Sequence, residues 1–209
     1  MDTTQGPLLV VEDVPDTRNL VELTLKFKGY RVVTATNGQE ALKAIEEERP
    51  SVIITDILMP RMDGFTLVHR LRVHPETRDI PVVFLSATYV QPEDKDFAVA
   101  IGVTQFLEKP IDIEELLRTV ARLLDNQAPD DHKPLEEHDF YDGYRKRLET
   151  KLHQKTTQIA RIKGMLETLP AEEKPTFEAS LEAATAERDE IQHLLSQIRD
   201  RLDLNENPK

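Results

Sequence analysis

Five chemically reactive side chains each follow a short apolar run in the first half of the sequence. They are the carboxylates of Glu12, Asp13 and Asp56, the hydroxyl of Ser86 and the ammonium group of Lys109. Carboxylates that lie close together repel one another and raise each other's pKa, unless a cation lies between them. Such oxygen ligands suit Mg²⁺, and an ammonium group and a hydroxyl opposite them can hold phosphate oxygens. The set therefore predicts phosphoryl transfer at a magnesium site, with Asp56 as the nucleophile.

The apolar runs that precede these residues are predicted strands. They read LLVV at 8–11, RVVT at 31–34, SVIIT at 51–55, PVVFL at 81–85 and TQFL at 104–107. Stretches of helical character alternate with them, at 15–28, 38–48, 64–72, 91–100 and 112–124. Five β/α repeats predict a parallel sheet with helices on both faces. Because the carboxyl ends of parallel strands meet at one edge, we expect the five reactive side chains to converge there.

The segment after Asp56 contains two turn signals, Met59-Pro60 and Asp63-Gly64. We expect them to turn the loop away, so that the face in front of Asp56 stays open. Asp63 is the predicted N-cap of the helix that begins at Gly64, and Asp112 is that of the last helix in this region. Asp56 alone would be interpreted as a strand-end cap, but the reactive groups at the other strand ends favour a functional role.

These motifs together resemble the receiver domain of bacterial two-component response regulators. The motifs are Val11-Glu12-Asp13, Asp56 with Met59-Pro60 and Asp63-Gly64, Leu85-Ser86-Ala87, and Lys109-Pro110. They fall in the order of that family over residues 6–124. The resemblance implies an α/β fold, a five-stranded, doubly wound, flavodoxin-like parallel sheet.

The resemblance also implies a phosphoryl acceptor and its metal ligands. Asp56 would accept a phosphoryl group from a sensor histidine kinase. Asp13, Asp56 and the backbone carbonyl of Leu58 would bind Mg²⁺, with Glu12 contributing through water. The chain would then be a signalling protein that catalyses only its own phosphorylation and dephosphorylation, and not an enzyme in the usual sense.

Further positions are assigned by the same resemblance. Lys109 and Ser86 would contact the phosphoryl group, and Ser86 and Phe106 would take part in switching. Tyrosine is common at the position of Phe106, so we expect a switch by packing and not by a hydroxyl hydrogen bond. Autodephosphorylation in the family depends on the positions occupied here by Leu58 and Thr88. Because a leucine cannot orient an attacking water, we expect a long-lived phosphate.

The remainder of the sequence has a different character. Residues 125–139 are polar, contain two prolines and are predicted to link a receiver domain at 1–124 to a helical region at 140–204, with a tail at 205–209. Apolar residues in the helical region recur at alternating intervals of four and three, as along a coiled-coil seam. Pro170 ends the first predicted helix and Pro175 begins the second.

The two seams match when the second helix folds back on the first. One seam consists of Tyr141, Arg145, Leu148, Leu152, Lys155, Ile159, Ile162, Leu166 and Leu169. The other consists of Phe177, Leu181, Ala184, Arg188, Ile191, Leu195, Ile198 and Leu202. Leu169 then meets Phe177 and Leu148 meets Ile198, which predicts an all-α antiparallel coiled-coil hairpin.

Apolar residues off the seams predict that the hairpin docks on another surface. These are Tyr144, Met165, Ala183 and Leu194. A second copy of the chain would give a homodimer with a four-helix bundle. The alternative is a single stalk on which these residues are exposed one by one.

Three outputs are consistent with the sequence. In the first, phosphorylation reorganises a coiled-coil dimer or a surface for a downstream protein partner. In the second, His153 or His193 makes the hairpin a phosphotransfer relay, although neither has the local pattern of such domains. In the third, the chain is a DNA-binding transcriptional regulator. The net charge of −12 divides evenly between residues 1–124 and 125–209, which argues against nucleic-acid binding.

Composition places the chain in the cytoplasm as the default. No apolar run approaches the roughly 20 residues of a membrane helix. The N-terminus lacks the basic and apolar regions of a signal peptide. There is no cysteine, so disulfides and thiol chemistry are excluded.

Overall fold

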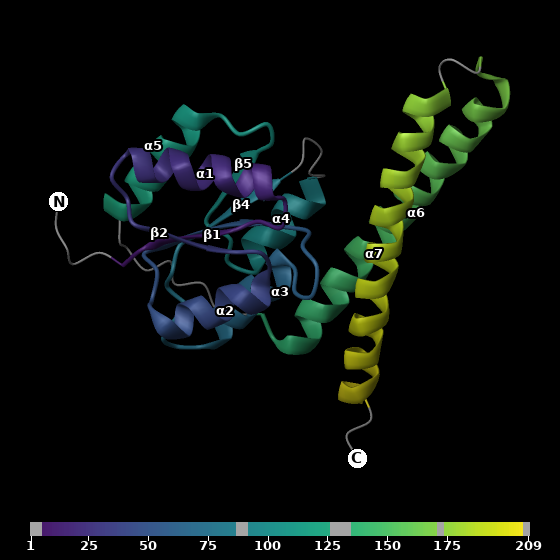
Figure 1. Cartoon of the computed structure of the whole chain (residues 1–209). Helices are drawn as coiled ribbons and strands as arrows, with labels where there is room; N and C mark the ends of the chain where they lie inside the picture. Colours follow the sequence, from purple (N-terminus) through teal and green to yellow (C-terminus); the bar gives the residue numbers. More distant parts are fainter. Residues whose placement is uncertain (1–5, 87–91, 126–134, 171–173, 207–209) are drawn as a thin grey trace. The chain divides into compact units, whose positions relative to one another are not determined.

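The computed structural model of the chain describes residues 6–86, 92–125, 135–170 and 174–206. Contacts divide the chain into two compact units, Met1–Leu135 and Glu136–Lys209. The first unit contains the sheet and the second contains two long helices (Figure 1). None of the helices in the described ranges is long and apolar enough to span a lipid bilayer.

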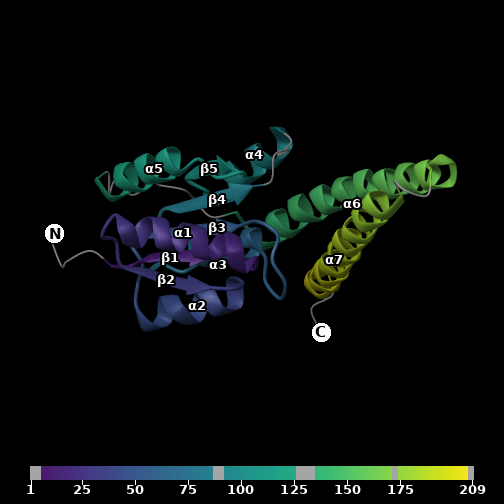
Figure 2. The same ribbon diagram turned by 45° about the horizontal axis from the view of Figure 1, so that its top comes forward.

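The first unit is a five-stranded parallel sheet with strand order β2-β1-β3-β4-β5. The strands are β1 (Leu8–Val11), β2 (Val32–Ala35), β3 (Val52–Asp56), β4 (Val82–Ser86) and β5 (Gln105–Glu108). The helices are α1 (Pro15–Phe27), α2 (Gly38–Glu47), α3 (Gly64–Val73), α4 (Pro92–Ala100) and α5 (Ile113–Asp125). Helices α1 and α5 cover one face and α2 and α3 cover the other (Figure 1). The predicted doubly wound fold is confirmed, and Figure 2 shows α2 beside the edge strand β2.

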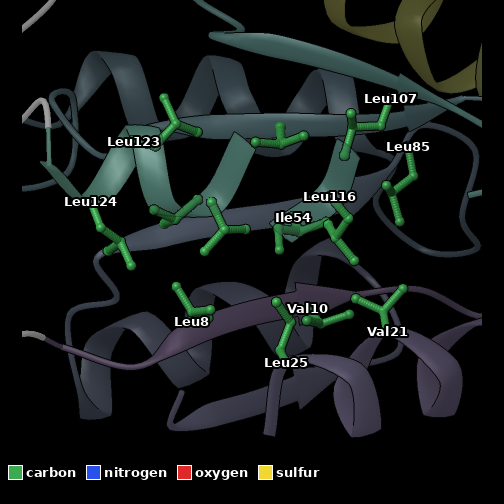
Figure 3. Close-up of a cluster of buried hydrophobic side chains, with 13 residues drawn as sticks. Leu8, Val10, Val21, Leu25, Ile54, Leu85, Leu107, Leu116, Leu123 and Leu124 are labelled. Atoms are coloured by element: carbon green, nitrogen blue, oxygen red, sulfur yellow. The ribbon is translucent and has the colours of Figure 1, made fainter. Parts of the chain in front are cut away.

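The core between the sheet and helices α1 and α5 is built from alternate strand residues. Leu8 and Val10 of β1 and Ile54 of β3 point toward Val21 and Leu25 of α1 (Figure 3). The α5 side chains in this cluster are Leu116, Val120, Leu123 and Leu124. Burying one such side chain contributes about 1.5–3 kcal/mol. This packing holds the strands in place and so fixes the positions of the residues at their carboxyl ends.

Four strands begin and end one residue later than predicted. The parallel pairing extends to Asp56 opposite Leu85 and to Ser86 opposite Glu108. Asp56 and Ser86 are therefore the last residues of β3 and β4 and not the first residues of loops. The ladder fixes their backbones, which leaves little freedom in where their side chains point.

The second unit consists of α6 (Glu137–Thr168) and α7 (Lys174–Glu206), which pack along the predicted seams. Every residue of both seams is buried or half-buried. Ile159, Ile162 and Ala184 form a buried cluster. Partly buried Leu166, Phe177 and Leu181 pack against it, as the antiparallel register requires. Of the predicted linker, residues 126–134 lie outside the described part, and 137–139 belong to α6.

Ion pairs between the two arms support this register. Lys155 Nζ lies 2.6 Å from Glu187 Oε2, and Arg199 Nη2 lies 3.3 Å from Glu149 Oε1. Arg145, a charged seam residue, pairs within its own helix with Asp142 at 2.7 Å. The charged seam positions are therefore accommodated at the edges of the apolar layers.

The four apolar residues off the seams divide into two pairs. Tyr144 and Leu194 are buried, whereas Met165 is 44% exposed and Ala183 is exposed. The apolar surface available to a second copy in this part of the hairpin is therefore smaller than the sequence predicts.

Candidate functional site

The carboxyl edge of the sheet brings three acidic residues together. Glu12 and Asp13 follow β1, and Asp56 ends the neighbouring strand β3. One carboxylate oxygen from each of these residues lies within 4.8 Å of the other two. The convergence expected from the strand order is therefore found, and Glu12 is fully buried.

Lys109, which follows β5, places its ammonium group beside two of these acids. Its Nζ lies 2.8 Å from Glu12 Oε2 and 3.3 Å from Asp56 Oδ1. Burial on its own would lower the pKa of Lys109, but the Asp56 and Glu12 carboxylates outweigh burial and raise that pKa. Lys109 is therefore protonated and serves as the positive group of the site. Its backbone N–H donates to the Ser86 carbonyl at 2.7 Å, which ties the ends of β4 and β5 together.

The Asp56 carboxyl is harder to ionise than an ordinary aspartate. Burial raises its pKa to about 6, Lys109 opposes this rise, and the nearby Glu12 carboxylate adds to it. The Ile57 N–H donates to Asp56 Oδ1 at 2.9 Å. Burial and repulsion between carboxylates are what a cation between these groups would relieve.

The residues after Asp56 form a tight loop that ends in the predicted cap. Asp63 Oδ1 accepts a hydrogen bond from the Thr66 N–H at 2.9 Å and caps α3, as predicted. The Gly64 N–H donates to the Ile57 carbonyl at 2.8 Å. A Cβ atom at Gly64 would lie only 2.5 Å from the Asp56 carbonyl oxygen. Glycine is therefore required for α3 to start this close to the acidic residue.

Arg18 holds the loop that carries the other two acids, a contact that the sequence did not indicate. Its Nη1 donates to the backbone carbonyls of Glu12 at 2.7 Å and of Asp13 at 3.3 Å. The N-cap residue of α1, Val14, makes no side-chain capping hydrogen bond. The turn between β1 and α1 is therefore fixed from the helix side by Arg18.

Phe106 belongs to a row of aromatic rings. It makes an edge-to-face contact with Phe84, its register partner on β4, with ring centroids 5.7 Å apart. Phe84 meets Phe65 of α3 at 5.2 Å, and Phe65 meets Phe97 of α4 at 5.5 Å. The predicted switch residue Phe106 is therefore connected by ring contacts to α3, through Phe84, and from there to α4. The sequence showed an aromatic residue at position 106 but not the rings that it contacts.

Ser86 ends β4 and is buried, and Leu58 lies in the loop after Asp56. Thr88 lies outside the described residues. His153 and His193 are exposed on the hairpin, in the other unit.

The donor set fits a magnesium ion. Two carboxylates from the turn after β1 and one from the end of β3 present oxygen ligands within one ion's reach. Mg²⁺ prefers one or two carboxylates together with waters and phosphate oxygens. Burial is the main cause of the raised pKa of Asp56, and the Glu12 carboxylate adds to it, so a cation bound beside Asp56 would favour its ionised form.

Comparisons with known proteins match this part of the chain. The family model for the response regulator receiver domain matches residues 8–121. An uncharacterised 14.6 kDa protein of Leptolyngbya boryana is 41% identical over 56% of this chain and 89% of its own length. The transcriptional regulator RpaA of Synechocystis, described as DNA-binding, is 37% identical over 56% of this chain and 48% of its own length. The chain thus spans about half the length of this regulator.

Solved structures agree. The chemotaxis response regulator CheY4 of Vibrio cholerae is 39% identical, with a TM-score of 0.54 over 58% of this chain and all of CheY4. A putative response regulator of Chloroflexus aurantiacus is 34% identical, with a TM-score of 0.55 over 59% of this chain and 100% of its own. By its fold, its acidic edge and this match over more than half of its length, the chain belongs to the response regulator receiver domain family.

Proposed function

We propose that this chain is a cytoplasmic response regulator that accepts a phosphoryl group on Asp56 from a sensor histidine kinase. The observation that carries the proposal is the position of Asp56, with the Lys109 ammonium group 3.3 Å away and two further carboxylates beside it. Its pKa of about 6 leaves Asp56 ionised, and so nucleophilic, at neutral pH.

Each residue of the site has a role in this transfer. An Asp56 oxygen attacks the phosphorus of a phosphohistidine, the P–N bond breaks, and the histidine keeps its electron pair. Lys109 exchanges part of its contact with Glu12 for a phosphoryl oxygen, and the Ser86 hydroxyl donates to another. Asp13, Asp56 and the Leu58 carbonyl would hold Mg²⁺, with Glu12 contributing through water, and the ion would neutralise charge on the transferring group.

The chain's own chemistry can be tested without a kinase. Incubation with acetyl phosphate and Mg²⁺ should add one phosphoryl mass, and Asp56→Asn should abolish that gain. Asp79→Asn, at an exposed aspartate, is the matched control and should leave the gain intact. An unchanged gain in Asp56→Asn would overturn the assignment.

An exposed apolar row on α1 supports a protein as the phosphoryl donor. Leu20, Leu23 and Phe27 are spaced so that they lie on one side of the helix, and Phe27 is 89% exposed. The helix begins two residues after Asp13, so Leu20 lies nearest to the reactive edge, and Phe27, the last residue of the helix, lies farthest from it. Exposed apolar patches mark protein-binding surfaces, and a donor that reaches Asp56 must cover the neighbouring surface. We therefore place the kinase on α1.

We further propose that the output runs through the hairpin, either as a homodimer or by binding a downstream protein. Met165 and Ala183 offer a small exposed apolar surface for this contact. Light scattering with and without Mg²⁺ and beryllofluoride distinguishes the cases. A mass of twice 23.9 kDa in both states means a constitutive dimer, doubling only with beryllofluoride means switched dimerisation, and a monomer in both states means a separate partner.

A further inference from the structure

The loop that follows Asp56 is fastened to the start of α2. This loop, residues 57–63, contains Leu58, whose carbonyl is a proposed metal ligand. The Gly38 N–H donates to the Met62 carbonyl at 2.9 Å. A Cβ atom at Gly38 would lie 2.7 Å from Met62 Cγ and 2.9 Å from its carbonyl oxygen. The loop and the first residue of α2 are therefore so close that only glycine fits at position 38.

Arg61 adds a side-chain bond to this contact. Its Nη2 lies 3.0 Å from Glu40 Oε1 and 3.2 Å from Thr36 Oγ1. Glu40 is itself held in place, because its Oε2 accepts hydrogen bonds from the Thr36 N–H at 2.9 Å and the Thr36 hydroxyl at 2.6 Å. Asn37, fully buried, caps the same helix. Arg61 therefore bonds to a Glu40 carboxylate that is already held in place by its hydrogen bonds to Thr36.

The backbone of Arg61 is unusual. Among the described residues it is the one non-glycine residue with positive φ, at 67°. That conformation is strained for a residue with a Cβ atom, whereas glycine adopts it readily. The ion pair with Glu40 is 55% and 43% exposed at its two side chains, and such pairs add little stability. Stability alone therefore does not account for an arginine here, and strained residues cluster at functional sites.

We propose that Arg61 is a positioning residue for the metal site. By its bonds to Glu40 and Thr36 it holds the 57–63 loop in the conformation that presents the Leu58 carbonyl and Asp56 to Mg²⁺. This inference rests on the proposed function. It adds a residue that touches neither the metal nor the phosphoryl group.

The variant Arg61→Gly isolates the side chain, because glycine keeps the backbone conformation without strain. Glu40→Gln removes the opposite charge. Arg49→Ala is the matched control, since Arg49 forms an equally exposed ion pair with Asp79 at 2.8 Å before β3, at the far end of that strand from Asp56. Mg²⁺ affinity is measured by calorimetry, and amide hydrogen exchange and melting temperature are measured in metal-free protein.

We expect Arg61→Gly and Glu40→Gln each to weaken Mg²⁺ binding by about two- to fivefold, the range that an exposed ion pair can supply. The double variant should be no weaker than Arg61→Gly alone, since that variant already removes the bond to Glu40 as well as the bond to Thr36. The amides of Gly38, Met62 and Gly64 should exchange faster in both variants. The melting temperature should stay at the wild-type value in Glu40→Gln and should not fall in Arg61→Gly, because glycine relieves the backbone strain at this positive φ. Arg49→Ala should keep the wild-type Mg²⁺ affinity and the wild-type exchange of these amides.

Two results would overturn the proposal. If Arg61→Gly binds Mg²⁺ as tightly as wild type, Arg61 does not position the site, although the proposed function stands. If exchange rises throughout the first unit and the melting temperature falls, Arg61 serves general stability only. Failure of the wild-type chain to bind Mg²⁺ would instead reject the metal step of the proposed function, and this inference with it.

Discussion

Lys109 and Glu12 form an ion pair inside the acidic site, with Nζ 2.8 Å from Oε2 and no exposed surface on the Glu12 side chain. This distance is shorter than the 3.3 Å from the same ammonium group to Asp56. Lys109 therefore neutralises the most deeply buried carboxylate of the site before any ligand binds. It is available to a phosphoryl group on Asp56 by a small movement toward that residue.

Lys109→Met should destabilise the metal-free protein. The substitution leaves the buried Glu12 carboxylate without its cation. Removing one partner of a buried pair is costly, but Lys109 is partly exposed, so we expect a loss of about 1–3 kcal/mol in the free energy of unfolding. Urea unfolding of wild type and variant at pH 7 in EDTA measures this loss in unfolding free energy. The double variant Glu12→Gln/Lys109→Met should recover most of the loss, and wild-type stability in Lys109→Met would contradict the pairing.

The pKa of Asp56 predicts a pH dependence of stability. Burial raises this pKa from 3.8 to about 6 in the folded protein. The folded state therefore binds the Asp56 proton more tightly than the unfolded state. Its stabilising contribution is fully present below pH 3.8 and is lost as pH rises to about 6.

The difference in unfolding free energy between wild type and Asp56→Asn isolates this group from other carboxylates. Relative to the variant, wild-type protein in EDTA should lose about 2–3 kcal/mol between pH 4 and pH 7. Mg²⁺ should bind more tightly over the same range, because it requires the ionised carboxylate. A flat difference curve would show that the pKa of Asp56 is not raised.

The acidic cluster followed from the sequence because it depends only on strand order. Parallel strands present their carboxyl ends at one edge, so Glu12, Asp13 and Asp56 had to converge once the β/α repeats were recognised. Contacts made by long side chains across the fold could not be predicted in this way. Neither the bonds of Arg18 to two backbone carbonyls nor the positive φ of Arg61 leaves a local pattern.

In the hairpin, too, some features could be predicted from the sequence and others could not. Its seams were predictable because heptad spacing is a property of the chain itself. The burial of the off-seam residues Tyr144 and Leu194 was not, since it depends on what covers each position in three dimensions. The strand ends were displaced by one residue because pairing of Asp56 with Leu85 is decided by the neighbouring strand.

The exposed row on α1 predicts that substitutions in it slow phosphorylation by a histidine kinase but not phosphorylation by acetyl phosphate. Leu20→Ser and Leu23→Ser should slow phosphotransfer from a histidine kinase that phosphorylates the wild-type chain, by roughly tenfold if each side chain is buried in the complex. Neither should alter phosphorylation by acetyl phosphate, which needs no docking surface. Val73→Ser, at an exposed apolar residue that ends α3, is the control. Equal slowing of both reactions would indicate damage to the site instead.

The hairpin seam predicts that a charge destabilises the hairpin at a seam position and has no effect at an exposed position. Ile191→Asp places an unpaired charge in a buried layer and should destabilise the hairpin by at least about 3 kcal/mol. Leu166→Asp, at a half-buried seam position, should act in the same direction. Met165→Asp, at an exposed residue, should leave helix content and unfolding unchanged. Circular dichroism during urea unfolding makes the comparison. Equal effects at 165 and 191 would contradict the seam.

The lifetime of the phosphate on Asp56 depends on what lies two residues further along the chain. Leu58 is half-buried in the loop after Asp56, and its side chain has no group that can hold a water for attack on phosphorus. We therefore expect a half-life of minutes or longer after removal of the donor, followed by mass spectrometry. Leu58→Asn supplies a donor and an acceptor that can orient water, so it should shorten the half-life several-fold. Leu58→Met keeps the side chain apolar and should retain the wild-type lifetime. A half-life of seconds in the wild-type chain would show that another group positions the water, and no change in Leu58→Asn would show that residue 58 does not face the phosphoryl group.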